Sequence, residues 1–155
     1  MILMAPLPIR AMEYYSVIGI FELTVYAGME ELFRKLKREN IKNGIASAKP
    51  EVFLLRIAEH LGLTELFDTL NGSGIDFIHS DKSLIIRWAM EAMNLLNGAK
   101  VLMVGDRCFD INGAKKAGVD SAGVLFGYGS REEFEEAGAD YIAADADELF
   151  RIIAD

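Results

Sequence analysis

Hydrophobic and polar residues along this chain fall into blocks that predict helices and strands in alternation. In residues 29–40, the apolar side chains Met29, Leu32, Phe33 and Leu36 have the i, i+3, i+4, i+7 spacing of an amphipathic helix. Comparable patterns predict helices over residues 50–63, 80–98, 110–118, 130–138 and 145–154. Short apolar runs predict strands over residues 41–48, 66–74, 100–106, 120–129 and 140–144. This alternation indicates an α/β fold with a parallel sheet flanked by helices.

Single residues predict where several helices begin and end. Pro50 suits a helix start, where its missing N–H does no harm, and either Ser80 or Asp81 can cap the helix over residues 80–98. Gly62 and Gly98 stand where C-terminal caps are expected. Residues 1–25 fit the alternation less well: residues 9–22 predict a helix and a turn, and residues 1–5 a strand or a frayed end. We therefore predict one α/β core over residues 26–155.

The composition of the 155 residues narrows the class of protein. A hydrophobic content of 52% and a charged content of 26% are typical of one soluble domain, and the net charge of −8 argues against nucleic acid as a partner. The single cysteine, Cys108, excludes an intrachain disulfide. His60 and His79 lack the spacing of metal ligands, and Cys108 has no evident histidine partner that would make it a nucleophile. Without a signal peptide or membrane-spanning run in the sequence, we expect a cytoplasmic protein that does not bind membranes.

Ligands of parallel α/β sheets bind beyond the carboxyl ends of the strands, so polar residues at those positions are the candidates. Ser47, residues 72–74, Asp106 and residues 127–130 all occupy such positions. Asp106 and Asp110 are four residues apart at the end of a buried strand. They are either an N-cap and a first-turn carboxylate or a site for a hard cation such as Mg²⁺, and the paired spacing favours the cation site.

Two further residues point to phosphate. Lys82 begins the helix that precedes the Asp106 strand, which places it at the same edge of the sheet. It is either a solvated surface lysine or a charge that neutralises phosphate. Ser47 either caps the helix that begins near Pro50 or binds a phosphoryl oxygen together with the neighbouring backbone N–H groups.

The order of these motifs resembles a known family. Ser47 in IASAKP, Lys82 in HSDKSLIIRWAM, and Asp106 and Asp110 in MVGDRCFD resemble the motifs of the haloacid dehalogenase-like (HAD) phosphatases. The segments GIFELTVYAGMEELFRKLK, SAKPEVFLLRIAEHLGL and GYGSREEFEEAGADYIA resemble the phosphoglycolate-phosphatase-like branch. The resemblance implies a Rossmann-like core and Mg²⁺-dependent phosphoryl transfer through an aspartyl-phosphate, with a small phosphate monoester or inorganic phosphate as the ligand.

The resemblance also implies a role for each candidate. Ser47 and Ala48 would bind the transferring phosphoryl group, and Lys82 would stabilise the charge of the nucleophile and the phosphate. Asp106 would coordinate Mg²⁺, and Asp110 would ligate or support it. The substrate would be phosphoglycolate-like or a nucleotide or sugar phosphate.

One part of the family pattern is missing. The family's nucleophile lies in an Asp-x-Asp-x-Thr pattern on an N-terminal strand, whereas the first aspartate of this chain is Asp68. Residues 1–25 would then be a remnant of the family's helical cap or a substitute strand, with Ala5 and Pro6 where the carboxylates belong. We expect little or no phosphatase activity from this chain alone.

Three alternatives remain open. The chain is a non-catalytic module that binds phosphate or Mg²⁺, it is completed by another subunit, or it forms a homodimer through an exposed sheet edge. A response-regulator-like receiver domain is disfavoured, because the acidic residues that such a domain needs near its N-terminus are absent.

Overall fold

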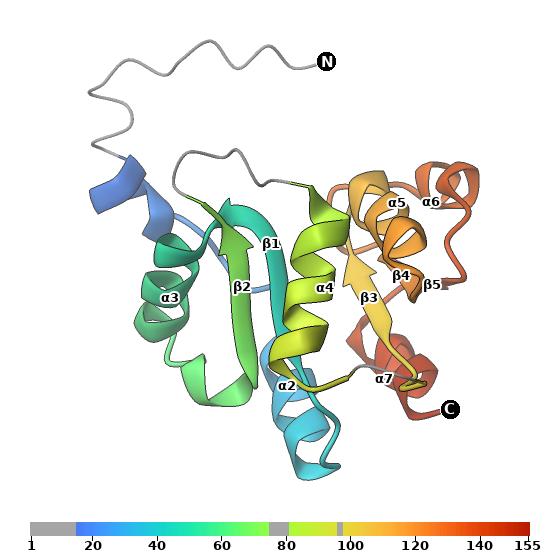
Figure 1. The fold of residues 1–155 in the computed structure, drawn as a ribbon, viewed down its shortest axis with the longest axis horizontal. Coiled ribbons are helices and arrows are strands. Elements are labelled where there is room, and N and C mark those ends of the chain that lie inside the picture. The colour runs from blue at the N-terminus through green and yellow to red at the C-terminus, as the bar shows by residue number, and fades with distance from the viewer. Residues whose placement is uncertain (1–14, 75–80, 96–97) are drawn as a thin grey trace, which may run out of the picture.

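Parallel strands lie between two layers of helices in the computed structural model, which describes residues 15–74, 81–95 and 98–155 (Figure 1). The strands are β1 (Gly44–Pro50), β2 (Thr69–Ser73), β3 (Leu102–Gly105), β4 (Asp120–Val124) and β5 (Tyr141–Ala143). The α-helices are α2 (Met29–Arg38), α3 (Glu51–His60), α4 (Lys82–Ala92), α5 (Cys108–Ala117), α6 (Arg131–Ala137) and α7 (Ala146–Ala154). Two short 3₁₀ turns are η1 (Gly19–Phe21) and η2 (Thr64–Leu66). The predicted α/β fold class is confirmed.

The strands form two sheets rather than the single sheet that the sequence predicts. β1 pairs with β2 in a parallel two-stranded sheet, and β3, β4 and β5 form a parallel three-stranded sheet in that order. Among the described residues, no hydrogen-bonded strand joins β1 to β3. Each sheet therefore presents an edge whose backbone groups have no strand partner within the described chain. The strand or frayed end expected over residues 1–5 lies outside the described residues.

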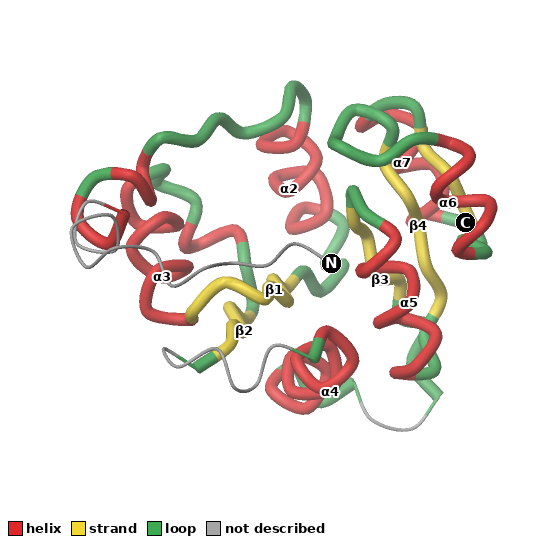
Figure 2. The backbone as a smooth tube through the Cα atoms, turned by 90° about the horizontal axis from the view of Figure 1, so that it is seen from above, coloured by secondary structure: helices red, strands yellow, loops and turns green. Residues whose placement is uncertain are grey.

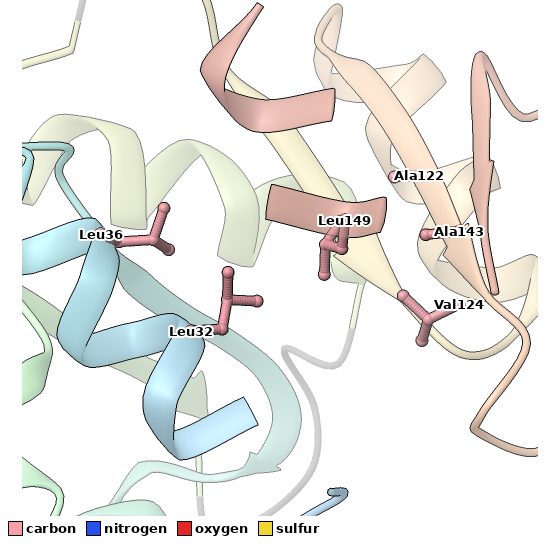
Figure 3. Close-up of a cluster of buried hydrophobic side chains, with 6 residues drawn as sticks. All are labelled: Leu32, Leu36, Ala122, Val124, Ala143 and Leu149. Atoms are coloured by element: carbon pink, nitrogen blue, oxygen red, sulfur yellow. The ribbon is translucent and has the colours of Figure 1, made fainter. Parts of the chain in front are cut away.

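Helices cover both faces of the strands. Figure 2 shows α2 and α4 on opposite sides of β1. α4 packs against β1, β2 and α5, so it connects the layer over the first sheet with the layer over the second. On the other side, a buried cluster joins α2, β4, β5 and α7 (Figure 3), with the members Leu32, Leu36, Ala122, Val124, Ala143 and Leu149. The cluster thus packs α2 and α7 on the second sheet, and α4 connects the two sheets through its contacts with β1, β2 and α5.

Most helix boundaries follow the predicted signals, with one exception. Asp81 is the N-cap of α4, and its carboxylate accepts a hydrogen bond from the Ser83 N–H at 2.9 Å. The same helix ends at Ala92, six residues before the expected stop at Gly98. Asn94 adopts a φ of 54°, and the Leu95 N–H donates to the Met90 carbonyl at 2.9 Å. Asparagine tolerates this left-handed conformation, so it closes the helix as glycine often does.

Among the described residues, none of the helices is both long enough and apolar enough to cross a membrane.

The buried cluster of Figure 3 leads to a prediction about the free energy of unfolding. Leu149 is 1% exposed and packs between the helices and strands of the second sheet. Replacement of Leu149 by alanine should lower the free energy of unfolding by about 2–5 kcal/mol, since it removes buried methyl groups and leaves a cavity. Leu55→Ala, at a residue that is 48% exposed on α3, is the matched control. Equal losses in urea unfolding would contradict the assignment of the core.

Candidate functional site

The predicted site residues come from three elements. Ser47 lies in β1, Lys82 is the first residue of α4, and Asp106 and Asp110 follow the end of β3. Ser47 lies inside its strand rather than beyond it, because β1 continues to Pro50. The register of β1 against β2 shifts between Ala46 and Pro50, so the strand is irregular where Ser47 stands.

Lys82 connects β1 with α5. Its ammonium nitrogen donates to the Ala46 carbonyl at 3.0 Å and lies 2.9 Å from Oδ1 of Asp110. The two side chains of this ion pair are only 17% and 12% exposed. An ammonium carries three N–H donors, and these two contacts use two of them. Among the residues that the structure describes, Lys82 therefore retains a donor for an anion placed at this point.

Asp110 is held by both of its carboxylate oxygens. Oδ1 binds Lys82, and Oδ2 accepts the backbone N–H of Arg107 at 3.2 Å. Gly105 makes room for this carboxylate, because a Cβ at Gly105 would lie 2.1 Å from the Asp110 Cβ. Both carboxylate oxygens of Asp110 thus have partners within the described part of the chain.

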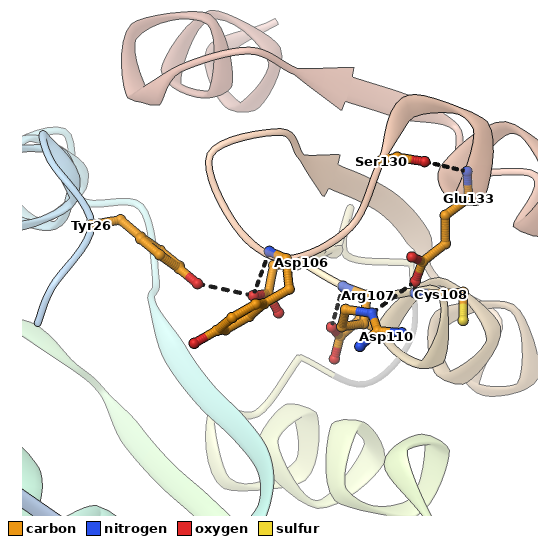
Figure 4. Close-up of polar contacts among 8 residues, drawn as sticks. Tyr26, Asp106, Arg107, Cys108, Asp110, Ser130 and Glu133 are labelled. Atoms are coloured by element: carbon orange, nitrogen blue, oxygen red, sulfur yellow. Dashed lines mark hydrogen bonds and ion pairs between the residues drawn. The ribbon is translucent and has the colours of Figure 1, made fainter. Parts of the chain in front are cut away.

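The loop after β4 wraps around Asp106 (Figure 4). The Tyr128 N–H donates to Oδ2 of Asp106 at 3.3 Å, and the Gly129 N–H donates to the Asp106 carbonyl at 2.8 Å. Gly127 lies against the aspartate, since a Cβ there would come within 2.3 Å of the Asp106 Cβ. Residues 127–129 thus do more than turn the chain: they hold Asp106 in place.

Tyr26 also binds Asp106, from the segment that leads into α2. Its hydroxyl donates to Oδ2 at 3.1 Å. Burial and, after it, the hydrogen bond to Asp106 raise the pKa of Tyr26, so the hydroxyl remains a protonated donor at neutral pH. The sequence gives no signal for this contact, because the two residues are 80 positions apart and neither lies in a shared motif.

Ser47 and Ala48 line the same end of β1. The Ser47 hydroxyl accepts the Lys49 N–H at 3.1 Å, and within the described ranges its own proton remains available for a ligand. The Ala48 carbonyl accepts a hydrogen bond from Ser73 at 2.8 Å. Residues 72–74, which also pass the strand-end filter, pack closely instead: a Cβ at Gly72 would lie 2.4 Å from the Lys49 carbonyl oxygen.

Glu133 supports the start of α5 from the neighbouring helix α6. Its carboxylate accepts the Cys108 N–H at 2.7 Å and the Arg107 Nε–H at 3.0 Å (Figure 4). The bond from the Cys108 backbone, followed by that from Arg107, lowers the pKa of Glu133. Burial, followed by the nearby Glu133, raises the pKa of the Cys108 thiol. A thiol that stays protonated is a poor nucleophile, in line with the expectation for Cys108.

The donor set suits a hard cation such as Mg²⁺. The described residues contain no group of three or more His, Cys, Asp or Glu side chains that could hold a metal ion by themselves. Mg²⁺ does not need such a group, because it commonly takes one or two protein carboxylates and fills its shell with water and phosphate oxygens. Asp106 could supply one such carboxylate, and Asp110 lies four residues further along the chain, in the first turn of α5.

Known proteins are similar to this chain in sequence and in fold. Residues 9–124 match the family model for haloacid dehalogenase-like hydrolases. The chain is 31% identical over 141 residues to a 5'-nucleotidase of Pseudomonas aeruginosa, covering 91% of this chain and 63% of that protein. It is 27% identical over 143 residues to a phosphoglycolate phosphatase of Vibrio parahaemolyticus, covering 92% and 62%.

The fold comparison agrees. A crystal structure of a predicted phosphatase from Clostridium acetobutylicum matches with a TM-score of 0.87 and 41% identity, covering 92% of this chain and 65% of that one. The chain thus spans less than two thirds of the length of each of these three proteins. The matches confirm the resemblance found in the sequence.

The lowered pKa of Glu133 predicts how the stability of the fold changes in acid. A lowered pKa in the folded state means that this carboxylate stabilises the fold fully above its ordinary pKa of 4.5 and loses that contribution as the pH falls through the lowered value. Glu133→Gln should therefore be less stable than the wild type in urea at neutral pH, and the difference should shrink near about pH 3. Glu136→Gln, an exposed change on the same helix, is the control. A constant gap between wild type and Glu133→Gln at both pH values would contradict this.

Proposed function

Because the chain belongs to the haloacid dehalogenase-like hydrolases, we propose that it functions in the Mg²⁺-dependent hydrolysis of a small phosphate monoester. The observation that supports this most strongly is the ammonium of Lys82, fixed between β1 and Asp110 at the carboxyl ends of the strands. The two curated relatives suggest the substrate class, since one is a 5'-nucleotidase and the other a phosphoglycolate phosphatase.

Each residue of the site has a role in this proposal. The Ser47 hydroxyl and the backbone at Ala48 bind phosphoryl oxygens, and the third N–H of Lys82 neutralises phosphate charge. Asp106 holds the cation, and Asp110 fixes Lys82. Bound Mg²⁺ would supply further charge stabilisation for the phosphoryl oxygens. Positioning and charge neutralisation of this kind are the main contributions of a protein to phosphoryl transfer.

Binding of the two ligands tests the proposal. Mg²⁺ and inorganic phosphate should each raise the melting temperature of the wild-type chain. Asp106→Asn should weaken Mg²⁺ binding at least about tenfold, and Lys82→Met should weaken phosphate binding by about 10–100-fold, because a charge-assisted hydrogen bond is lost. Ser47→Ala, which leaves the ion pair intact, should also weaken phosphate binding. Lys116→Met, an exposed lysine on α5, is the matched control.

Calorimetric titration of each ligand measures these changes. If Lys116→Met reduced phosphate affinity as much as Lys82→Met, the phosphate would bind by general charge attraction and the assigned site would be wrong.

We further propose that the 155-residue chain has little turnover by itself. Attack on phosphorus in this family needs an aspartate from an Asp-x-Asp-x-Thr pattern, and residues 1–67 contain no aspartate. With p-nitrophenyl phosphate and Mg²⁺, the rate should equal that of the buffer. Turnover that disappears in Asp106→Asn would contradict this expectation. Ligand binding without turnover would favour a non-catalytic phosphate- or Mg²⁺-binding module.

The two separate sheets favour a second candidate, a site completed by another chain. The facing edges of β1 and β3 have no strand partner among the described residues, and unpaired edges readily accept a further strand. In that case specific activity should rise with chain concentration, and sedimentation should show a dimer or a larger complex. A strict monomer at all concentrations would exclude self-association of this kind.

A further inference from the structure

The two carboxylate oxygens of Asp106 have different surroundings. Oδ2 accepts two hydrogen bonds, from the Tyr26 hydroxyl at 3.1 Å and from the Tyr128 backbone N–H at 3.3 Å. A carboxylate oxygen has about two lone pairs, so these donors occupy Oδ2. Within the described part of the chain, the structure gives no hydrogen bond to Oδ1. A cation that approaches this carboxylate therefore meets its available lone pairs on Oδ1.

Tyr26 is itself held in place from two directions. Its ring packs edge-to-face against Phe126, with the ring centres 5.7 Å apart and an interplanar angle of 76°. Its carbonyl accepts the Met29 N–H at 3.1 Å, at the start of α2. Because both the ring and the backbone are fixed, the hydroxyl reaches Asp106 from one direction and can hold the carboxylate in one orientation.

We propose that Tyr26 is a positioning residue that orients Asp106 so that Oδ1 alone ligates the divalent cation. This inference rests on the proposed function, because it assigns a role to a residue beside the proposed cation site. Hydrogen-bonded partners of metal ligands fix the ligand's orientation, and their loss typically weakens metal affinity by about 10–100-fold. Tyr128 contributes to this orientation through its backbone N–H.

Two other roles for the contact make different predictions. As a simple tether between the segment before α2 and the loop after β3, the hydroxyl would contribute to stability and leave cation affinity unchanged. As a competitor for the carboxylate, it would weaken cation binding, and its removal would tighten it. The positioning role alone predicts weaker binding when the hydroxyl is removed.

The test uses Tyr26→Phe, which keeps the ring against Phe126 and removes only the hydroxyl. We expect the Mg²⁺ dissociation constant, measured by calorimetry, to rise about tenfold or more. Tyr141→Phe, at a tyrosine that is 44% exposed in β5, is the control and should match the wild type. Infrared difference spectra on Mg²⁺ addition provide a second readout: the carboxylate bands assigned with Asp106→Asn should indicate one-oxygen ligation in the wild type and a changed mode in Tyr26→Phe.

Each result has one meaning. An unchanged or a lowered dissociation constant in Tyr26→Phe overturns the positioning role and leaves the proposed function standing. A wild-type chain that binds no Mg²⁺ overturns both. If the Mg²⁺ dissociation constant rises equally in Tyr26→Phe and Tyr141→Phe, the positioning role is also overturned, because the effect would not depend on the contact with Asp106.

Discussion

The ion pair between Lys82 and Asp110 is the contact on which the site depends. Its partners come from α4 and α5, and the same ammonium binds the Ala46 carbonyl of β1. With side chains only 17% and 12% exposed, both charges have lost much of their hydration and are stable only as partners. No strand pairing joins β1 to β3 in the described chain, and this polar bridge connects β1 with α5, which packs on β3 and β4.

The rest of the site is arranged around that bridge. Asp110 is fixed by Lys82 and by the Arg107 N–H, which leaves Asp106, four residues earlier, as the carboxylate with an available oxygen. Three segments that are far apart in the sequence hold Asp106: the strand β3, the loop at residues 127–129, and Tyr26. Positive charge and a hydroxyl on the β1 side thus face negative charge on the β3 side. A phosphate with its cation matches this distribution of charge.

The sequence predicts the parts of this fold that depend on local spacing. Periodicity and end signals identify the helices and strands, and the filter for strand ends selects Ser47 and Asp106 together with residues 72–74 and 127–130. Asp110 follows from its four-residue spacing to Asp106, and Lys82 from its place at the start of a helix. The sequence does not predict that the strands separate into two sheets, because periodicity identifies a strand but not which other strand it pairs with. It also misses the early end of α4 at Ala92, where Asn94 adopts a conformation more often assigned to glycine.

Contacts between residues far apart in the sequence could not be predicted either, because local patterns do not show which segments meet in the fold. Tyr26 binds Asp106 from 80 residues away, and Glu133 binds the Cys108 N–H at the start of α5 from 25 residues away. No rule of sequence spacing connects either residue to its partner. Gly105 and Gly127 resemble ordinary turn residues in the sequence. Their function becomes visible only when the aspartate side chains are seen to occupy the space that a Cβ would fill.

A crystal structure of this chain grown with Mg²⁺ and inorganic phosphate is the most direct measurement. We predict a phosphate with oxygens within hydrogen-bonding distance of the Ser47 hydroxyl and the Lys82 ammonium, and a cation bound to Oδ1 of Asp106. A phosphate bound elsewhere, with the cation on a carboxylate outside residues 106–110, would contradict the assignment of this site.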